Sequence, residues 1–257
     1  MRRHLISTNP QNWSRVLKVL QLSTTPTGSA SPTSDSPLIK RSRTLLLCLK
    51  QPWRLGYRGV VHFSITNPSE DSPLLYFRGK AILEKALIDS GLSYAIIRPA
   101  VIFGLEDILI NNIAWLLRKF PVFTVPGSGK YKLQPVCVED VADIAVSAGH
   151  QNKNSIIDAV GPETYCYGDL VRLIAETIGS AARIIHVPPR LALALTRILD
   201  FIVRDVVLTR EEIDGLMQGL LVSRDPPTGK TYLSQWLKQN ADIIGRQYAS
   251  EVAQHYQ

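Results

Sequence analysis

The sequence predicts an α/β fold built on a parallel sheet, and the order of its apolar segments is the first reason. Short apolar runs at residues 60–65 and 92–98 indicate buried strands, and residues 80–90 between them have the spacing of an amphipathic helix. Strands that alternate with helices in this way favour right-handed βαβ units, in which the strands run parallel. The length of 257 residues, with 45% hydrophobic and 20% charged residues, suits a globular protein of one or two domains.

Each predicted element has its own local signal. The first strand is a run of Val, Phe and Ile that ends in the turn-rich segment 66–73. The following helix places Leu83, Ala86 and Leu87 on one face, and Pro99 stops the second strand. Further helices are predicted over residues 111–119, 139–149 and 168–179, and further strands over residues 132–138 and 155–160.

The last part of the chain, residues 188–257, is predicted to be mostly helical. Residues 191–203 and 233–248 carry apolar side chains over lengths that suit helices. Thr209, with Glu212 three residues later, has the pattern of a helix start. A smaller helical region is therefore expected to follow the sheet.

The beginning of the chain has a different composition. Residues 23–37 are almost all Ser, Thr, Pro, Gly and Ala, which bury too little apolar surface to offset the entropy of ordering. We interpret residues 1–41 as a disordered or non-native segment. The alternative is an organelle transit peptide, because no acid precedes Asp35 and residues 12–22 have the spacing of a short amphipathic helix.

Charge and composition limit the classes of function. Residues 1–69 hold ten of the 29 Lys and Arg but one of the 22 Asp and Glu, so the net charge of +7 is poor support for nucleic-acid binding by the remainder. No apolar run reaches the 18 or so residues of a membrane-spanning helix, so no transmembrane segment is predicted. Cys48, Cys137 and Cys166 lie far apart without a His cluster, which indicates neither disulfides nor a metal site. The predicted location is the cytoplasm, with an organelle as the alternative.

Three side chains form the sharpest candidate site. Tyr76 and Lys80 are four residues apart, so on a helix they share one face, and Ser64 stands at the end of the preceding strand. A neighbouring cation favours the phenolate and lowers a tyrosine pKa, which suits Tyr76 to exchange a proton while Ser64 orients a carbonyl or alcohol. The alternative is that Tyr76 is a half-buried ring and Lys80 a solvated charge.

Several ordered motifs resemble the short-chain dehydrogenase/reductase superfamily. They are Tyr76-Phe-Arg-Gly-Lys80, the run from Ile97 to Gly104 that contains Arg98-Pro99-Ala100-Val101, and Pro135-Val-Cys-Val-Glu-Asp-Val-Ala142. The similarity is greatest to its atypical, extended branch, which includes epimerase/dehydratase-like and NmrA-like proteins and an accessory subunit of respiratory complex I. It runs from about residue 58 to residue 159.

The resemblance implies specific roles and a cofactor, NAD or NADP. It places the catalytic set on Ser64, Tyr76 and Lys80. It also assigns Lys80 to the nicotinamide ribose and the segment with Arg98, Pro99 and Val101 to the cofactor. Residues 42–187 are then a partial Rossmann-type domain, and residues 188–257 shape the substrate pocket.

The chain departs from the family pattern at the glycine-rich turn that binds the pyrophosphate. No GxGxxG or GxxGxxG occurs, and Gly28 is the only glycine before Gly56. We therefore expect the first half of the Rossmann sheet to be missing, cofactor binding to be impaired and the strand at residues 60–65 to lie at an exposed sheet edge.

Two functions from different classes follow. The first is an NAD(P)-dependent oxidoreductase or epimerase-like enzyme that acts on a small molecule. The second is a catalytically silent scaffold or assembly factor of the same fold, with a protein partner or a second copy bound at the sheet edge. Neither implies specific nucleic-acid binding, and the substrate cannot be read from the fold.

Overall fold

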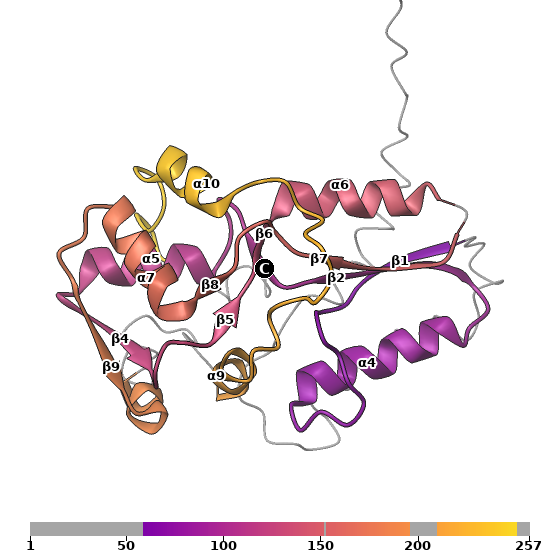
Figure 1. The fold of residues 1–257 in the computed structure, drawn as a ribbon, viewed down its shortest axis with the longest axis horizontal. Coiled ribbons are helices and arrows are strands. Elements are labelled where there is room, and N and C mark those ends of the chain that lie inside the picture. Colours follow the sequence, from indigo (N-terminus) through magenta and orange to yellow (C-terminus); the bar gives the residue numbers. More distant parts are fainter. Residues whose placement is uncertain (1–58, 152, 196–209, 251–257) are drawn as a thin grey trace, which may run out of the picture.

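The computed structural model describes residues 59–151, 153–195 and 210–250. The predictions for residues 1–41, for the helix at residues 12–22 and for the Thr209 cap lie outside these ranges, as does the second part of the helix predicted at residues 191–203. The prediction of an α/β fold with parallel sheets is confirmed (Figure 1).

Three parallel strands form the sheet that positions the predicted site. β1 (Gly59–Phe63) pairs with β2 (Ser93–Pro99), and β2 pairs with β7 (Ser155–Ala159). Ile96 and Ile97 of the central strand are fully buried, in agreement with an apolar strand that is covered on both faces. Within the described residues β1 has a neighbour on one side only, so it forms an edge of this sheet.

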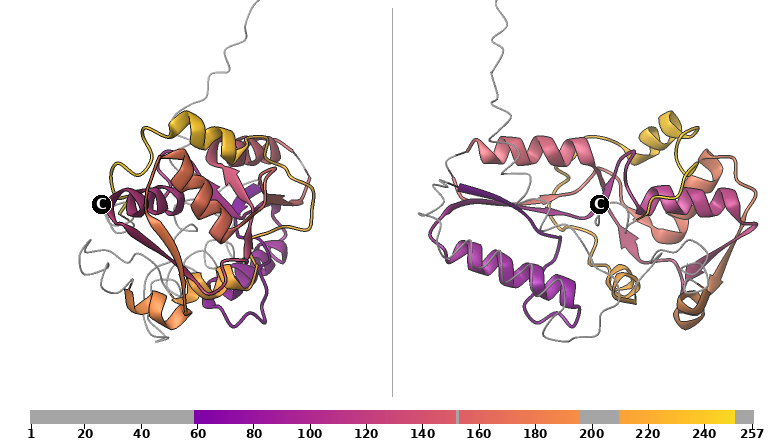
Figure 2. Two further views of the ribbon diagram at one scale, coloured as in Figure 1. Left: turned by 60° about the vertical axis from the view of Figure 1, so that its left-hand side comes forward. Right: turned by 180° about the vertical axis from the view of Figure 1, so that it is seen from behind.

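A helix covers each face of the sheet (Figure 2). α4 (Leu75–Ile88) contributes Leu83 and Leu87 to a cluster with Ile96, whereas α6 (Val138–Gly149) contributes Val141 and Ala148 to a cluster with Ile97. The alternation of β2 side chains between the two faces thus assigns one helix to each face. α4 begins five residues before the predicted start at Lys80.

The largest hydrophobic core lies outside the three-stranded sheet, among elements that follow β2 in the chain. Two short strands, β5 (Lys132–Leu133) and β6 (Pro135–Cys137), replace the single strand predicted at residues 132–138, because Gln134 belongs to neither strand and the two strands pair with different partners. The other elements of this part are β3 (Val101–Phe103), α5 (Leu109–Lys119), β4 (Val122–Pro126), β8 (Tyr165–Cys166), α7 (Tyr167–Thr177) and β9 (Arg183–Val187).

Long-range pairing organises these short strands. β3 pairs with β6 in parallel, β4 pairs with β9 in parallel, and β5 pairs with β8 in antiparallel orientation. Neither β4 nor β9 was predicted. Their core includes Phe103, Leu133 and Leu170, all fully buried, together with Leu237 from the C-terminal region. The predicted division of the chain at residues 187 and 188 stays a prediction.

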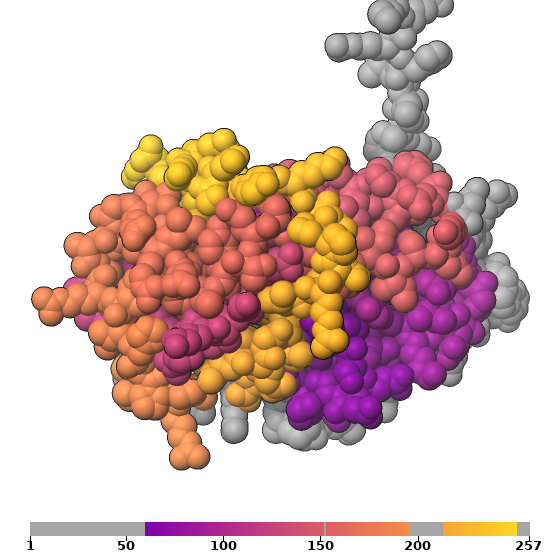
Figure 3. Space-filling view, viewed as in Figure 1, coloured from indigo at the N-terminus to yellow at the C-terminus, as the bar shows by residue number. Residues whose placement is uncertain are grey.

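The described parts of the C-terminal region contain helices, which were predicted, and these are separated and followed by segments without helix. A helix covers residues 189–195, α9 spans Arg210–Met217 and α10 spans Leu233–Asn240. Between α9 and α10, residues 219–231 run without a helix across the molecule, and we call them the crossing segment. The C-terminal region, gold in Figure 3, passes over the front between the part with α7 and the part with α4. Within the described ranges, none of the helices has the length and apolar character needed to span a bilayer.

Candidate functional site

Ser64, Tyr76 and Lys80 gather where β1 ends and α4 begins. The Ser64 backbone N–H donates to the Ile97 carbonyl at 2.7 Å, so the ladder between β1 and β2 continues one residue past Phe63. Tyr76 and Lys80 occupy the first two turns of α4. The structure therefore brings together the three residues of the predicted catalytic set.

Lys80 is a buried lysine with a fixed position. Its side chain is 5% exposed, and its Nζ donates a hydrogen bond of 2.9 Å to the Phe63 carbonyl. The same Nζ lies 5.5 Å from the centroid of the Tyr76 ring. Burial lowers the pKa of Lys80 to about 7, and the Glu84 carboxylate opposes this shift by favouring the charged form. The alternative of a solvated lysine is therefore wrong.

Two further polar side chains are buried on the α4 side of β1. Val60 packs under α4, and because side chains alternate along a strand, His62 and Ser64 point to the same side. No described residue forms a hydrogen bond with the Ser64 hydroxyl or with His62 Nε2. A buried polar atom without a partner costs about 1–3 kcal/mol, and such atoms are common at binding sites. The Ser64 hydroxyl thus has hydrogen-bonding capacity that no described residue uses.

His62 makes stability depend on pH. Burial, aided by the nearby Lys80 cation, lowers the pKa of His62 to about 3. Below its unfolded-state pKa near 6.5, the unfolded chain takes up a proton that the folded chain refuses. Stability should therefore fall as pH drops from about 6.5 toward 3, by up to about 1.4 kcal/mol per pH unit for this one proton. The His62→Gln variant should lack this component.

Urea unfolding of both proteins at several pH values between 7 and 4 measures the effect. Other groups contribute equally to the two proteins, so the difference between their stability curves isolates His62. If the difference in free energy of unfolding between the parent and His62→Gln stays constant over this range, His62 accepts a proton in the folded protein as readily as in the unfolded chain, and the expectation is wrong.

The residues assigned to the cofactor lie in different surroundings. Arg98 forms two hydrogen bonds with Glu84, from Nε at 3.0 Å and from Nη2 at 2.5 Å, and this contact raises the Arg98 pKa. Pro99 is buried at the end of β2, and its carbonyl accepts the Thr66 N–H at 3.1 Å. The Val101 side chain is buried in the largest core. The cofactor roles of these residues stay predictions.

The crossing segment closes the carboxyl end of β1 beside Tyr76. The Thr66 hydroxyl and the Asn67 side-chain amide both donate to the Leu220 carbonyl, each at 2.9 Å. Leu220 and Leu221 pack with Tyr76 against a small apolar cluster, which consists of Ile65, Leu74 and Phe77. The crossing segment and the Tyr76 ring therefore pack against the same apolar cluster.

A second set of contacts fixes the other end of the crossing segment. Ser223 Oγ donates to Asp158 Oδ2 at 2.5 Å, and the backbone N–H groups of Thr228 and Gly229 donate to the Val160 carbonyl. Asp158 lies near the carboxyl end of β7 and Val160 directly follows it. The crossing segment therefore spans the carboxyl ends of β1 and β7, the two edge strands of the described sheet.

Sequence reasoning missed two features of this site. The first is Glu84, whose place in the site could have been predicted from the sequence: it follows Lys80 by four residues, as Lys80 follows Tyr76, so all three share one face of the helix. The packing of Leu220 against the cluster next to Tyr76 has no local sequence signal, because more than 140 residues separate Leu220 from Tyr76 and the crossing segment has no regular structure.

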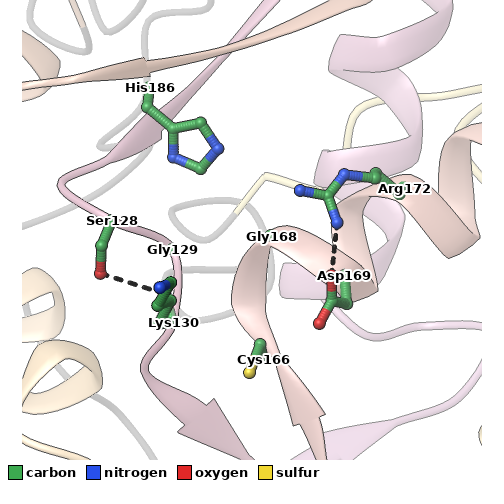
Figure 4. A pocket seen from close by; sticks show the side chains of 8 residues that line it. All are labelled: Ser128, Gly129, Lys130, Cys166, Gly168, Asp169, Arg172 and His186. Atoms are coloured by element: carbon green, nitrogen blue, oxygen red, sulfur yellow. Dashed lines mark hydrogen bonds and ion pairs between the residues drawn. The ribbon is translucent and has the colours of Figure 1, made fainter.

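A separate pocket lies in the part of the molecule with β4, α7 and β9 (Figure 4). Its volume is about 540 Å³, and the side chains of His186 and Arg172 face each other across it. Arg172 is engaged by Asp169, and His186 Nδ1 lies 3.1 Å from the Gly127 carbonyl. The pocket does not include the predicted catalytic residues. Its lining consists of Ser128, Gly129, Lys130, Cys166, Gly168, Asp169, Arg172 and His186.

Curated proteins with similar sequences are known. The chain is 27% identical over 179 residues to the mitochondrial NADH dehydrogenase (ubiquinone) 1 alpha subcomplex subunit 9 of Arabidopsis thaliana, a match that covers 65% of this chain and 44% of that protein. It is 27% identical over 143 residues to the photosystem II assembly factor Ycf39 of Cyanidium caldarium, which covers 55% of this chain and 45% of that protein. The chain thus spans less than half the length of these relatives. No family model matches it.

Solved structures share the fold at low sequence identity. A nucleoside-diphosphate-sugar epimerase from Staphylococcus aureus superposes with a TM-score of 0.63 at 16% identity, covering 81% of this chain and 75% of the epimerase. The triphenylmethane reductase of Citrobacter sp., solved with NADP(H), superposes with a TM-score of 0.61 at 15% identity, covering 81% and 73%. These likenesses agree with the Rossmann-type architecture.

Proposed function

Because the chain belongs to the short-chain dehydrogenase/reductase superfamily, we propose that it is an NAD(P)-dependent oxidoreductase or epimerase-like protein that uses Tyr76, Lys80 and Ser64. The observation that supports this most is the buried Lys80 Nζ, bonded to the carbonyl next to Ser64 and 5.5 Å from the Tyr76 ring. A buried lysine is costly for a fold, so its retention beside a tyrosine favours a chemical role.

Each of the three side chains has a distinct task. Tyr76 gives a proton to, or takes one from, the oxygen of a substrate carbonyl or alcohol. The Lys80 ammonium stabilises the negative charge of the phenolate that forms when Tyr76 gives up its proton. The Ser64 hydroxyl donates a hydrogen bond to the same substrate oxygen and holds it beside Tyr76.

The described residues fit the nicotinamide end of a dinucleotide. Lys80 offers donors to a ribose, and the Ser64 hydroxyl is buried without a described partner. A bound nicotinamide supplies or accepts hydride, and Lys80 with the backbone of Pro99 would hold that end. The pyrophosphate end differs, because the chain contains no glycine-rich fingerprint that would let backbone N–H groups approach it.

We therefore expect this chain to bind NADH and NADPH weakly. Calorimetric titration of the full chain with each nucleotide should give a dissociation constant well above micromolar, because contacts at the nicotinamide end alone provide little affinity. The Lys80→Met variant should weaken the residual binding further. A dissociation constant near 1 μM for the unmodified chain, about −8 kcal/mol, would show that another group binds the phosphates.

The second candidate function is a catalytically silent scaffold or assembly factor. The free edge of β1 in the described sheet supports it, because an apolar edge strand without Lys or Pro is a ready template for another strand. Two relatives are named as a subunit of a larger complex and as an assembly factor. No nucleotide binding at millimolar concentration would favour this candidate. Self-association through the β1 edge stays a prediction.

The cellular location also remains a proposal. We retain the cytoplasm as the first location and an organelle as the alternative. The basic, acid-poor beginning of the chain favours the alternative, as does the mitochondrial relative from Arabidopsis thaliana.

A further inference from the structure

Glu84, which is buried, forms an ion pair with the partly exposed Arg98. Glu84 follows Lys80 by one helical turn, and the two side chains are 4% and 5% exposed. Arg98 reaches from β2 and binds both carboxylate oxygens of Glu84. Such a bidentate contact between a guanidinium and a carboxylate holds the carboxylate in one orientation.

We propose that Glu84 is a positioning residue for Lys80: held by Arg98, it provides the buried negative charge that keeps the Lys80 side chain an ammonium beside Tyr76. This inference deepens the proposed function and rests on it for its catalytic meaning. The ionisation of Lys80 can nevertheless be measured without any substrate or nucleotide.

Among the described groups near Lys80, Glu84 carries the negative charge that acts on it. From β1 come a neutral His62 and the Phe63 carbonyl, neither of which carries a negative charge. From β2 comes the Arg98 cation, which repels Lys80. The Asp158 carboxylate at the end of β7 accepts a hydrogen bond from Ser223 and, like Asp225, acts on Arg98.

The balance of charges decides the state of Lys80 near neutral pH. Burial alone favours the neutral amine, and the Glu84 charge is the described influence that raises the Lys80 pKa. A neutral amine would lose the electrostatic effect on Tyr76. The ion pair of Glu84 with Arg98 would then hold α4 against β2 without supporting the Tyr76 phenolate.

Carbon-13 labelling of lysine at Cε tests the proposal, because the Cε chemical shift follows the protonation of Nζ. The Lys80 signal is assigned by its disappearance in Lys80→Met. In Glu84→Gln, which keeps a side chain of the same size beside Arg98, the titration midpoint of Lys80 should move down by roughly one pH unit or more. That corresponds to about a tenfold loss of ammonium relative to amine at a given pH.

Two further variants make the test specific. Arg98→Gln removes a repelling cation and frees Glu84 from its partner, so the Lys80 midpoint should move up, the opposite direction. Asp89→Asn is the control, because Asp89 pairs with Lys85 at 3.9 Å on the exposed side of the same helix and should leave the Lys80 midpoint unchanged.

The outcomes separate an electrostatic role from a structural one. If Glu84→Gln folds and the Lys80 midpoint stays where it is, the proposal is overturned and the pair is a tie between α4 and β2. If Glu84→Gln does not fold, Arg98→Gln decides: a raised midpoint supports the proposal and an unchanged one overturns it. A shifted midpoint in a chain that neither binds nucleotide nor turns over substrate would refute the proposed function and leave this inference standing.

Discussion

Replacing Tyr76 by phenylalanine is expected to lower turnover by roughly 100-fold to 10,000-fold while leaving the fold intact. The substitution removes the hydroxyl that would carry the proton and little else. The ring keeps its edge-to-face contact with Phe77, and the Lys80 amine keeps its place 5.5 Å from the ring centroid. The loss therefore measures proton transfer rather than folding.

The assay follows NADH or NADPH absorbance with a panel of aldehydes, ketones and quinones at nucleotide concentrations high enough to offset weak binding. Thermal melting of each variant checks the fold. Tyr94→Phe is the matched control, because Tyr94 lies at the amino end of β2, opposite to the end with Ser64, and should stay within a few-fold of the parent. Activity of Tyr76→Phe close to the parent value would remove Tyr76 from the catalytic set.

The sheet near the site could be predicted from local sequence because its strands are apolar on both faces. The strand predicted at residues 60–65 corresponds to β1, and the strand predicted at residues 92–98 corresponds to β2. The helix between them begins at Leu75 rather than Lys80. Its first turn lacks an acid and its N-cap, Leu74, makes no side-chain hydrogen bond, so the usual signals of a helix start are missing.

The features that escaped prediction depend on contacts between distant parts of the chain. β4 and β9 are short strands that pair across about 60 residues, and neither has a turn that would mark a hairpin. Local pattern does not reveal such a pairing. The same holds for the crossing segment, whose position depends on hydrogen bonds from Thr66 and Asn67 to the Leu220 carbonyl.

In the candidate site too, some features could be predicted from local sequence and others could not. The grouping of Tyr76 with Lys80 follows from helical spacing, and the place of Ser64 follows from its position after a strand. The state of Arg98 does not follow, because its partner Glu84 belongs to another element and meets it only when α4 packs on β2. A motif therefore located the reactive groups but not the charges that act on them.

The largest effect on stability is expected from Gly161→Ala. A Cβ atom at Gly161 would lie 1.9 Å from the Pro135 carbonyl oxygen and 3.4 Å from the Val136 Cα, which are backbone atoms of β6. Neither can rotate away as a side chain could. The Gly161 carbonyl also accepts the Gln134 side-chain N–H at 2.9 Å, so the two segments are held together on both sides of the clash.

To accommodate alanine, β6 must move away from the chain after β7, and it would carry β3 with it because the two strands are paired. We expect a loss of about 3 kcal/mol or more in the free energy of unfolding, which falls among the larger effects of single substitutions. For a chain of this size that loss corresponds to a fall in melting temperature of roughly 6–12 °C.

Gly79→Ala provides the matched control. Gly79 lies inside α4, and nothing is found within 4 Å of the position that its Cβ would take. Alanine is better than glycine in a helix interior by about 0.5–1 kcal/mol, so this variant should melt at the parent temperature or slightly above it. Calorimetry or circular dichroism of the two variants gives the comparison. If Gly161→Ala melted within a degree or two of Gly79→Ala, the chain after β7 could not pass as close to Pro135 as the structure places it.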